Sequence, residues 1–163
     1  MGREVSHAAR GVVPGILVLG ACSTAGPTPE ECTTNAVWNG GNEESPLMHP
    51  GGDCIGCHDQ EGEGPGYSVA GTVMGAYDEP TDCYGIEDVT VRVTDASGDV
   101  HEAVTNAAGN FFFGGDVPGP YTAEIERDGV VRAMVTPQTD GNCANCHTEV
   151  GASSAPGRIL VPQ

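Results

Sequence analysis

Residues 89–98 read Val-Thr-Val-Arg-Val-Thr-Asp-Ala-Ser-Gly, and apolar and polar side chains alternate along the first part of this stretch. Side chains on a β-strand point to opposite faces with a period of two, so Val89, Val91 and Val93 are expected to share one buried face. The Asp-Ala-Ser-Gly that follows is rich in turn-forming residues. The stretch therefore predicts a half-buried strand that ends in a tight turn.

Similar short apolar stretches lie on both sides of it. Further strands are expected at residues 68–74, 100–105, 110–113, 121–127 and 130–136. Pro118-Gly119-Pro120 breaks the chain between two of them, and Asp128-Gly129 is a two-residue hairpin signal. Residues 45–66 are expected to form a Gly-rich loop, and little helix is expected anywhere. About six short strands separated by turns predict a mainly β fold, a small antiparallel β-sandwich at residues 67–136.

Two copies of Cys-x-x-Cys-His flank the predicted sandwich, at residues 54–58 and 143–147. Two thiols at this spacing can add across the two vinyl groups of one haem, and the following histidine is then carried to the iron. The motifs predict two covalently bound haem c groups in two loops, held by Cys54, Cys57, His58, Cys143, Cys146 and His147. His58 and His147 are the expected proximal iron ligands. The alternative is a zinc site with the four thiolates as ligands, although such a site does not need a histidine after each pair.

The second axial ligand of each iron is expected from the few remaining methionines and histidines. Met48 and Met134 each precede a motif by a short distance and are the first choices. Met134 is expected to point outward from its strand, with Val131, Ala133 and Val135 on the core face. His49 and His101 are the alternative ligands, and Arg132 and Arg158 are candidates to neutralise haem propionates.

The N-terminus predicts export. Residues 1–21 hold two arginines and a short apolar run, which is typical of a signal peptide. The run ends in Leu19-Gly20-Ala21-Cys22, which resembles a bacterial lipobox and implies acylation of Cys22 and a membrane anchor; an ordinary signal peptide is the alternative. Residues 22–45 are expected to be a flexible acidic tether. Cys32 and Cys83 are then left over, and in an oxidising compartment they are a candidate disulfide.

The chain is strongly acidic. It carries 23 Asp and Glu against 6 Lys and Arg, a formal net charge of −17, and has no lysine. Such a surface repels nucleic acid and favours a basic redox partner. Solubility in a salty environment explains the same charge equally well.

Two resemblances follow from these residues. Residues 67–136 resemble the small β-sandwich modules related to carboxypeptidase regulatory-like and transthyretin-like domains, on Gly71-Thr72-Val73, residues 89–98, Thr105–Phe111 and Gly119-Pro120-Tyr121. Over residues 46–163 the chain resembles a bacterial dihaem c-type cytochrome lipoprotein with that sandwich inserted. This resemblance implies single-electron transfer in the periplasm or at the cell surface rather than catalysis. A dihaem peroxidase and a β-sandwich binding module are the alternatives.

The predicted order of strands has one geometric consequence. If six strands alternate in direction, the first begins and the last ends at the same pole of the sandwich. The two motifs lie just outside these points, so the two haem groups are expected to be neighbours.

Overall fold

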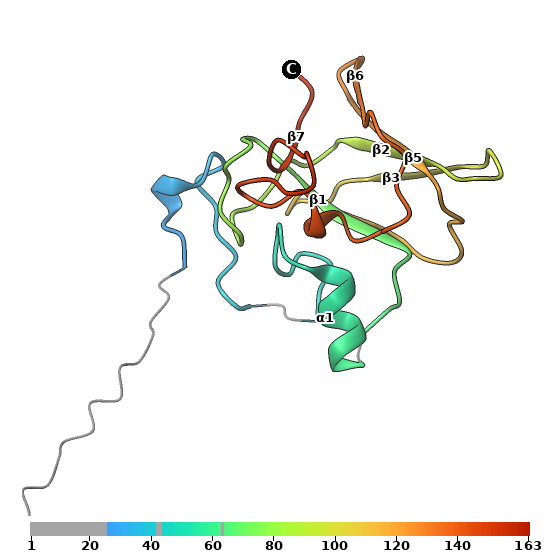
Figure 1. Cartoon of the computed structure of the whole chain (residues 1–163). Helices are drawn as coiled ribbons and strands as arrows, with labels where there is room; N and C mark the ends of the chain where they lie inside the picture. The colour runs from blue at the N-terminus through green and yellow to red at the C-terminus, as the bar shows by residue number, and fades with distance from the viewer. Residues whose placement is uncertain (1–25, 42–43, 63) are drawn as a thin grey trace, which may run out of the picture.

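The computed structural model describes residues 26–41, 44–62 and 64–163 (Figure 1). Within these ranges seven strands form two sheets, with one α-helix and two short 3-10 helices beside them. The predicted mainly β fold is confirmed. The predicted signal peptide, residues 1–21, and Cys22 lie outside the described residues. In the described part of the chain, no helix is long and apolar enough to cross a membrane.

The larger sheet has the strand order β3-β2-β5-β6, and its neighbouring strands are antiparallel. It contains β2 (Thr90–Thr94), β3 (Val100–Val104), β5 (Thr122–Arg127) and β6 (Val130–Ala133). In β2, Val91 and Val93 are buried, whereas Thr90, Arg92 and Thr94 are half-buried. The alternating apolar and polar residues of the sequence therefore lie on the two opposite faces of this strand.

The smaller sheet has the order β4-β1-β7. It contains β1 (Val69–Met74), β4 (Asn110–Phe113) and β7 (Ile159–Leu160). All residues of β1 are buried, because the larger sheet covers one face and the segments around the two motifs cover the other. β7 runs parallel to β1 and was not predicted, since a strand of two residues carries no periodic pattern.

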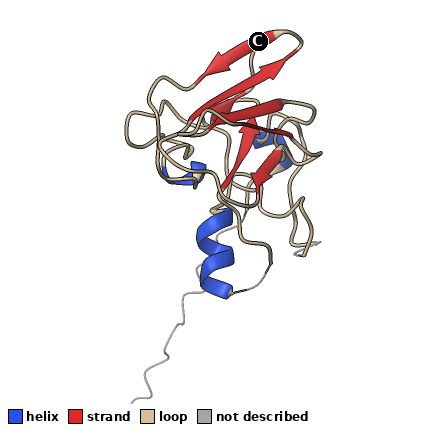
Figure 2. Cartoon of the chain, turned by 90° about the vertical axis from the view of Figure 1, so that its right-hand side faces the viewer, coloured by secondary structure: helices blue, strands red, loops and turns tan. Residues whose placement is uncertain are grey.

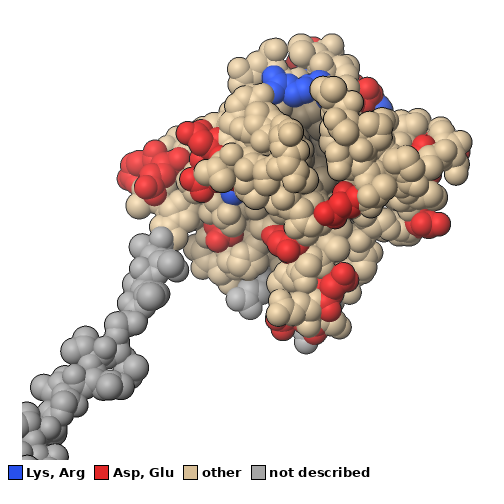
Figure 3. Space-filling model, in the orientation of Figure 1, with Lys and Arg blue, Asp and Glu red and all other residues tan. Residues whose placement is uncertain are grey.

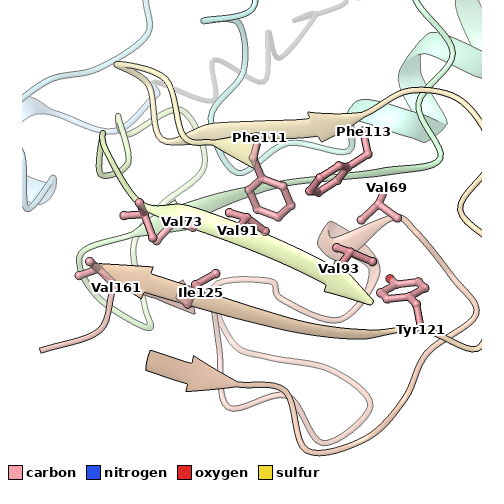
Figure 4. Packing of buried hydrophobic residues seen from close by; sticks show 10 residues of the cluster. Val69, Val73, Val91, Val93, Phe111, Phe113, Tyr121, Ile125 and Val161 are labelled. Carbon is pink, nitrogen blue, oxygen red and sulfur yellow. The ribbon is translucent and has the colours of Figure 1, made fainter. Parts of the chain in front are cut away.

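The hydrophobic core lies between the two sheets (Figure 4). It is built from valines and aromatic side chains: Val69, Val73, Val89, Val91, Val93, Phe111, Phe113, Tyr121, Ile125 and Val161. Burying one such side chain contributes about 1.5–3 kcal/mol, so this cluster supplies the apolar stabilisation of the sandwich.

The first motif forms a helix, which corrects the predicted loop. α1 spans Cys54–Glu61 and projects beside the strands in Figure 2. The Asp53 side chain caps its N-terminus by accepting a hydrogen bond from the Gly56 amide at 2.7 Å, and Gly62 ends it in the left-handed conformation with φ of 67°. None of its residues is buried, so the sequence has no apolar stripe that would predict a helix.

The segment predicted as a flexible tether is instead attached to the domain in its described part. A disulfide joins Cys32 to Cys83, and Val37 forms an isolated bridge with Cys83. The Trp38 amide donates to the Asp82 carbonyl at 2.8 Å. Before these contacts lies the 3-10 helix η1 (Pro29–Glu31). The disulfide and the backbone bonds hold this polar segment, although its sequence contains no strand or helix pattern.

Candidate cofactor site at the two Cys-x-x-Cys-His motifs

The two motifs lie side by side, although they are far apart in the chain. Asn142 Nδ2, just before the second motif, donates a hydrogen bond to Asp53 Oδ1, just before the first, at 2.5 Å. The second motif begins in the 3-10 helix η2 (Cys143–Asn145), which contacts β1, as α1 does. The Ala70 amide donates to the Gly141 carbonyl at 3.0 Å, so the C-terminal segment returns beside β1. The expectation that the motifs are neighbours agrees with this arrangement.

The two motifs share the local geometry of their first residues. Each is preceded by glycine and then by an Asp or Asn with φ of −81°, with ψ of 81° at Asp53 and 92° at Asn142. In each, the first thiol points back to the glycine carbonyl, at 3.7 Å from Cys54 Sγ and 3.8 Å from Cys143 Sγ. The repeated conformation presents the first cysteine of each motif in the same way.

Both histidines of the motifs have one ring nitrogen against a backbone carbonyl. His58 Nδ1 lies 3.1 Å from the Pro65 oxygen, and His147 Nδ1 lies 3.0 Å from the Gly157 oxygen. A carbonyl only accepts, so each Nδ1 carries the hydrogen and each Nε2 retains its lone pair in the neutral ring. This is the arrangement that prepares a histidine to bind a metal through Nε2.

The four motif cysteines are free thiols, whereas Cys32 and Cys83 are joined. Burial raises the pKa of the Cys54 thiol, and burial followed by the nearby Cys54 raises the pKa of Cys143 to about 12. Both thiols are therefore protonated at neutral pH, and the thiolate that would attack a disulfide is scarce. Free thiols at the spacing of the haem motif fit covalent attachment.

The zinc alternative does not fit the positions of these thiols. Four ligands of one zinc ion must lie close together around it. Among the described residues, the only group that brings three potential ligand atoms within 4.8 Å of one another is Cys32, Glu79 and Cys83, and two of these form the disulfide. The motif cysteines form no such group, so this geometry provides no four-thiolate site.

A small cleft lies between the segment before the first motif, strand β1 and the second motif. It is lined by Gly51, Gly52, Gly71, Thr72, Cys143, Ala144, His147, Arg158 and Ile159. A Cβ at Gly71 would lie 2.8 Å from the Cys143 Cβ and 3.1 Å from its sulfur. The second motif therefore packs directly against the backbone of β1, and this close approach requires glycine.

Of the predicted distal ligands before the first motif, His49 is held by other partners. Its ring packs against Trp38 with 3.9 Å between ring centroids and a tilt of 46° between the planes, and its Nδ1 lies 3.1 Å from Asp82 Oδ1. Met48 is half-buried, and its carbonyl accepts from Asn110 Nδ2 at 2.9 Å. The segment with both candidates is thus fixed to the start of β4 and to the disulfide-bonded loop.

The predicted orientation of Met134 is wrong. Ile125, which is buried, pairs with Arg132 across the β5–β6 ladder, so Arg132 and the next alternate residue, Met134, lie on the core side. Met134 packs against the core, whereas Val131 and Val135 are exposed. Met134 therefore does not point outward to a haem. The Arg132 side chain is exposed and donates a hydrogen bond to the Tyr77 hydroxyl at 2.9 Å.

His101 is also engaged, because its Nε2 lies 2.9 Å from Asp95 Oδ2. The hydrogen bond from His101 lowers the pKa of the Asp95 carboxyl, with further bonds from the Ser97 and Asp99 amides. The arrangement organises the turn between β2 and β3, and His101 is a structural residue of that hairpin.

Two residues of the site went unrecognised from the sequence. Asp53 and Asn142 join the motifs, and the only signal for them is the shared Gly-Asp/Asn that precedes each first cysteine. Arg158, a candidate to neutralise a haem propionate, is buried and donates four hydrogen bonds to protein acceptors. Comparison of the chain with protein-family models, with curated proteins and with solved structures finds no match.

Proposed function

We propose that this chain is an exported dihaem c-type cytochrome that carries single electrons. Each Cys-x-x-Cys-His motif would attach one haem through its two thiols, with His58 and His147 as proximal ligands. When bound, the haem groups supply reversible one-electron chemistry. The residues of the chain attach them, orient them and set their surroundings.

The observation that carries this proposal is the state of the two imidazoles. His58 and His147 each direct Nδ1 at a backbone carbonyl and keep Nε2 for a metal. A zinc site with the four thiolates as ligands would not require both histidines to direct Nδ1 at a carbonyl and keep Nε2 free. The free thiols beside each histidine support attachment, and the neighbouring motifs support electron exchange between the two sites.

Export and anchoring rest on the N-terminal sequence and on the disulfide. A disulfide persists in oxidising compartments, which agrees with a signal peptide at residues 1–21. Acylation of Cys22 would hold the protein at a membrane surface, on the periplasmic side or at the cell surface.

The acidic surface favours a basic redox partner. Asp and Glu are spread over the face drawn in Figure 3, with few Lys or Arg atoms between them. On the outer face of the larger sheet, Arg92 is paired with Glu102, Glu124 and Glu126, so even this cation lies among carboxylates. Electrostatic attraction would raise the association rate of a positively charged partner and would weaken as salt is added.

The test is export of the full chain to a bacterial periplasm with cytochrome-maturation machinery. The proposal predicts a mass increase of two haem groups per chain that survives denaturation, together with reversible reduced and oxidised visible spectra. Replacing Cys54 and Cys57 with Ala should remove one group, and replacing Cys143 and Cys146 should remove the other. The variant with both Cys32→Ala and Cys83→Ala removes the two cysteines outside the motifs; it should retain both groups, although loss of the disulfide lowers its stability.

Each contrary result has a defined meaning. A colourless protein would contradict the proposal. Two haem groups with a five-coordinate iron and rapid peroxide turnover would replace electron carriage by peroxidase chemistry. A protein with covalent haem that passes no electrons to any redox dye would also count against the carrier role.

A further inference from the structure

Arg158 brings a buried positive charge to the second motif. Arg158 directly precedes β7 and is 4% exposed. It is the only Arg among the buried residues of the described ranges. Its guanidinium donates to four acceptors: the Glu79 carbonyl at 3.0 Å, the Gly51 carbonyl at 2.9 Å, Thr81 Oγ1 at 2.8 Å and the His147 carbonyl at 3.4 Å. It therefore touches the backbone of the second motif's own histidine.

No carboxylate forms an ion pair with this guanidinium in the described chain. The acidic residues that act electrostatically on the pKa of Arg158 are Glu149 and Glu79. The Glu79 carboxylate accepts from the amide and hydroxyl of Thr33, both at 2.6 Å, and so is already engaged. Burial lowers the pKa of Arg158, but arginine remains charged at neutral pH. The site thus contains a full positive charge whose direct partners are neutral.

Among the described residues, no Arg side chain donates to a residue of the first motif; Arg158 reaches only the Gly51 carbonyl, three residues before Cys54. Asp53 caps α1, and Asp59 and Glu61 follow His58 in the same helix. His58 lies in the last turn of α1, close to the negative end of the helix dipole. The second motif also has acidic neighbours, Asp140 and Glu149, so Arg158 is the feature that distinguishes the two surroundings.

We propose that Arg158 raises the reduction potential of the group bound at the second motif above that of the group at the first, so that a shared electron resides at the second. This inference rests on the proposed function. The oxidised iron site carries one more positive charge than the reduced one, and a nearby buried cation destabilises it. One electron is redistributed between the sites, and no proton or bond is involved.

The test is a spectroelectrochemical titration of the haem-loaded full chain and four variants. Arg158→Gln removes the charge, Arg158→Lys keeps it, and Arg127→Gln removes an arginine at the β5–β6 turn, paired with Asp128, as the matched control. The variant with both Cys54→Ala and Cys57→Ala lacks the first group, so its remaining wave identifies the second site. In Arg158→Gln the second wave should fall by at least about 59 mV, a tenfold change in the reduced-to-oxidised ratio. Arg158→Lys and Arg127→Gln should leave it nearly unchanged.

Two results would overturn the inference and leave the proposed function intact. One is equal shifts in the Gln and Lys variants, which would mean that lost hydrogen bonds, not lost charge, move the potential. The other is a wild-type protein in which the wave of the first site is the higher, a measurement that stands even if Arg158→Gln does not fold. A chain that binds no haem would overturn both the inference and the function.

Discussion

Asp53 and Asn142 are separated by 89 residues and joined by a hydrogen bond of 2.5 Å from the Asn142 side chain to the Asp53 carboxylate. Asp53 also caps α1, and Asn142 also forms an isolated bridge with Ala70 of β1. Each of these two residues directly precedes the first cysteine of its motif, and their side chains connect one motif to the other. The relative position of the motifs is fixed by this contact at their first residues, before any cofactor is considered.

Asn142→Ala should weaken both the fold and this connection. The Asp53 carboxylate, which is exposed, would lose one charge-assisted partner at a part-buried contact, and the free energy of unfolding should fall by roughly 1 kcal/mol. Denaturant unfolding measures the loss. Asn39→Ala is the control, because Asn39 is exposed and its side-chain oxygen accepts from the Gly41 amide within its own turn. A double-mutant cycle with Asp53→Ala should show coupling of at least about 0.5 kcal/mol, and additive effects would contradict the contact.

Gly71→Ala should displace the second motif from β1. The added methyl would lie 2.8 Å from the Cys143 Cβ and 3.0 Å from Phe111 Cζ, and neither the strand nor the core has room to move freely. Overpacking of this kind costs about 1–3 kcal/mol, which thermal unfolding would detect. Gly66→Ala is the matched control, since a Cβ there meets nothing within 4 Å. Equal melting temperatures for the two variants would argue against the close packing.

The sequence predicted the strands that bury one face, because such strands carry a period of two. Val91 and Val93 of β2 are the clearest case. It did not predict α1, whose side chains are all outside the core and whose ends depend on Asp53 and Gly62. The face of Met134 was assigned wrongly because β6 is an exposed edge strand, in which hydrophobicity does not mark the inner side. The Asp53–Asn142 contact leaves no periodic pattern, and only the Gly-Asp or Gly-Asn before each first cysteine marks its two residues.

Loss of the disulfide should release the N-terminal segment. Cys32 and Cys83 close a loop with a separation of 51 residues, for which chain entropy gives about 4 kcal/mol of stabilisation. The only tryptophan of the chain, Trp38, packs against His49 beside this bond. The Cys32→Ser, Cys83→Ser variant should therefore unfold more readily, and its tryptophan emission should move to longer wavelength as water reaches the ring.

The control for the disulfide is Thr34→Ala, which removes one hydrogen bond from the Thr34 hydroxyl to the Tyr84 carbonyl in the same segment. It should cost about 1 kcal/mol and leave the emission of Trp38 in place. If the serine variant keeps the emission of the native protein, the segment is held without the disulfide and the assigned role is wrong.

The thiols of the haem-free chain should differ in reactivity. Because burial raises the pKa of Cys143 to about 12, its thiolate is scarce at pH 8 and should increase about tenfold per pH unit until the pH approaches that value. Cys57 is exposed and should be alkylated by iodoacetamide well before Cys143 in the folded protein. Mass spectrometry of the modified peptides measures each rate. In denaturant the difference should vanish, since burial is its main cause. Equal rates in the folded protein at pH 8 would show that the second motif is open to solvent, and the packing of Cys143 against Gly71 would have to be abandoned.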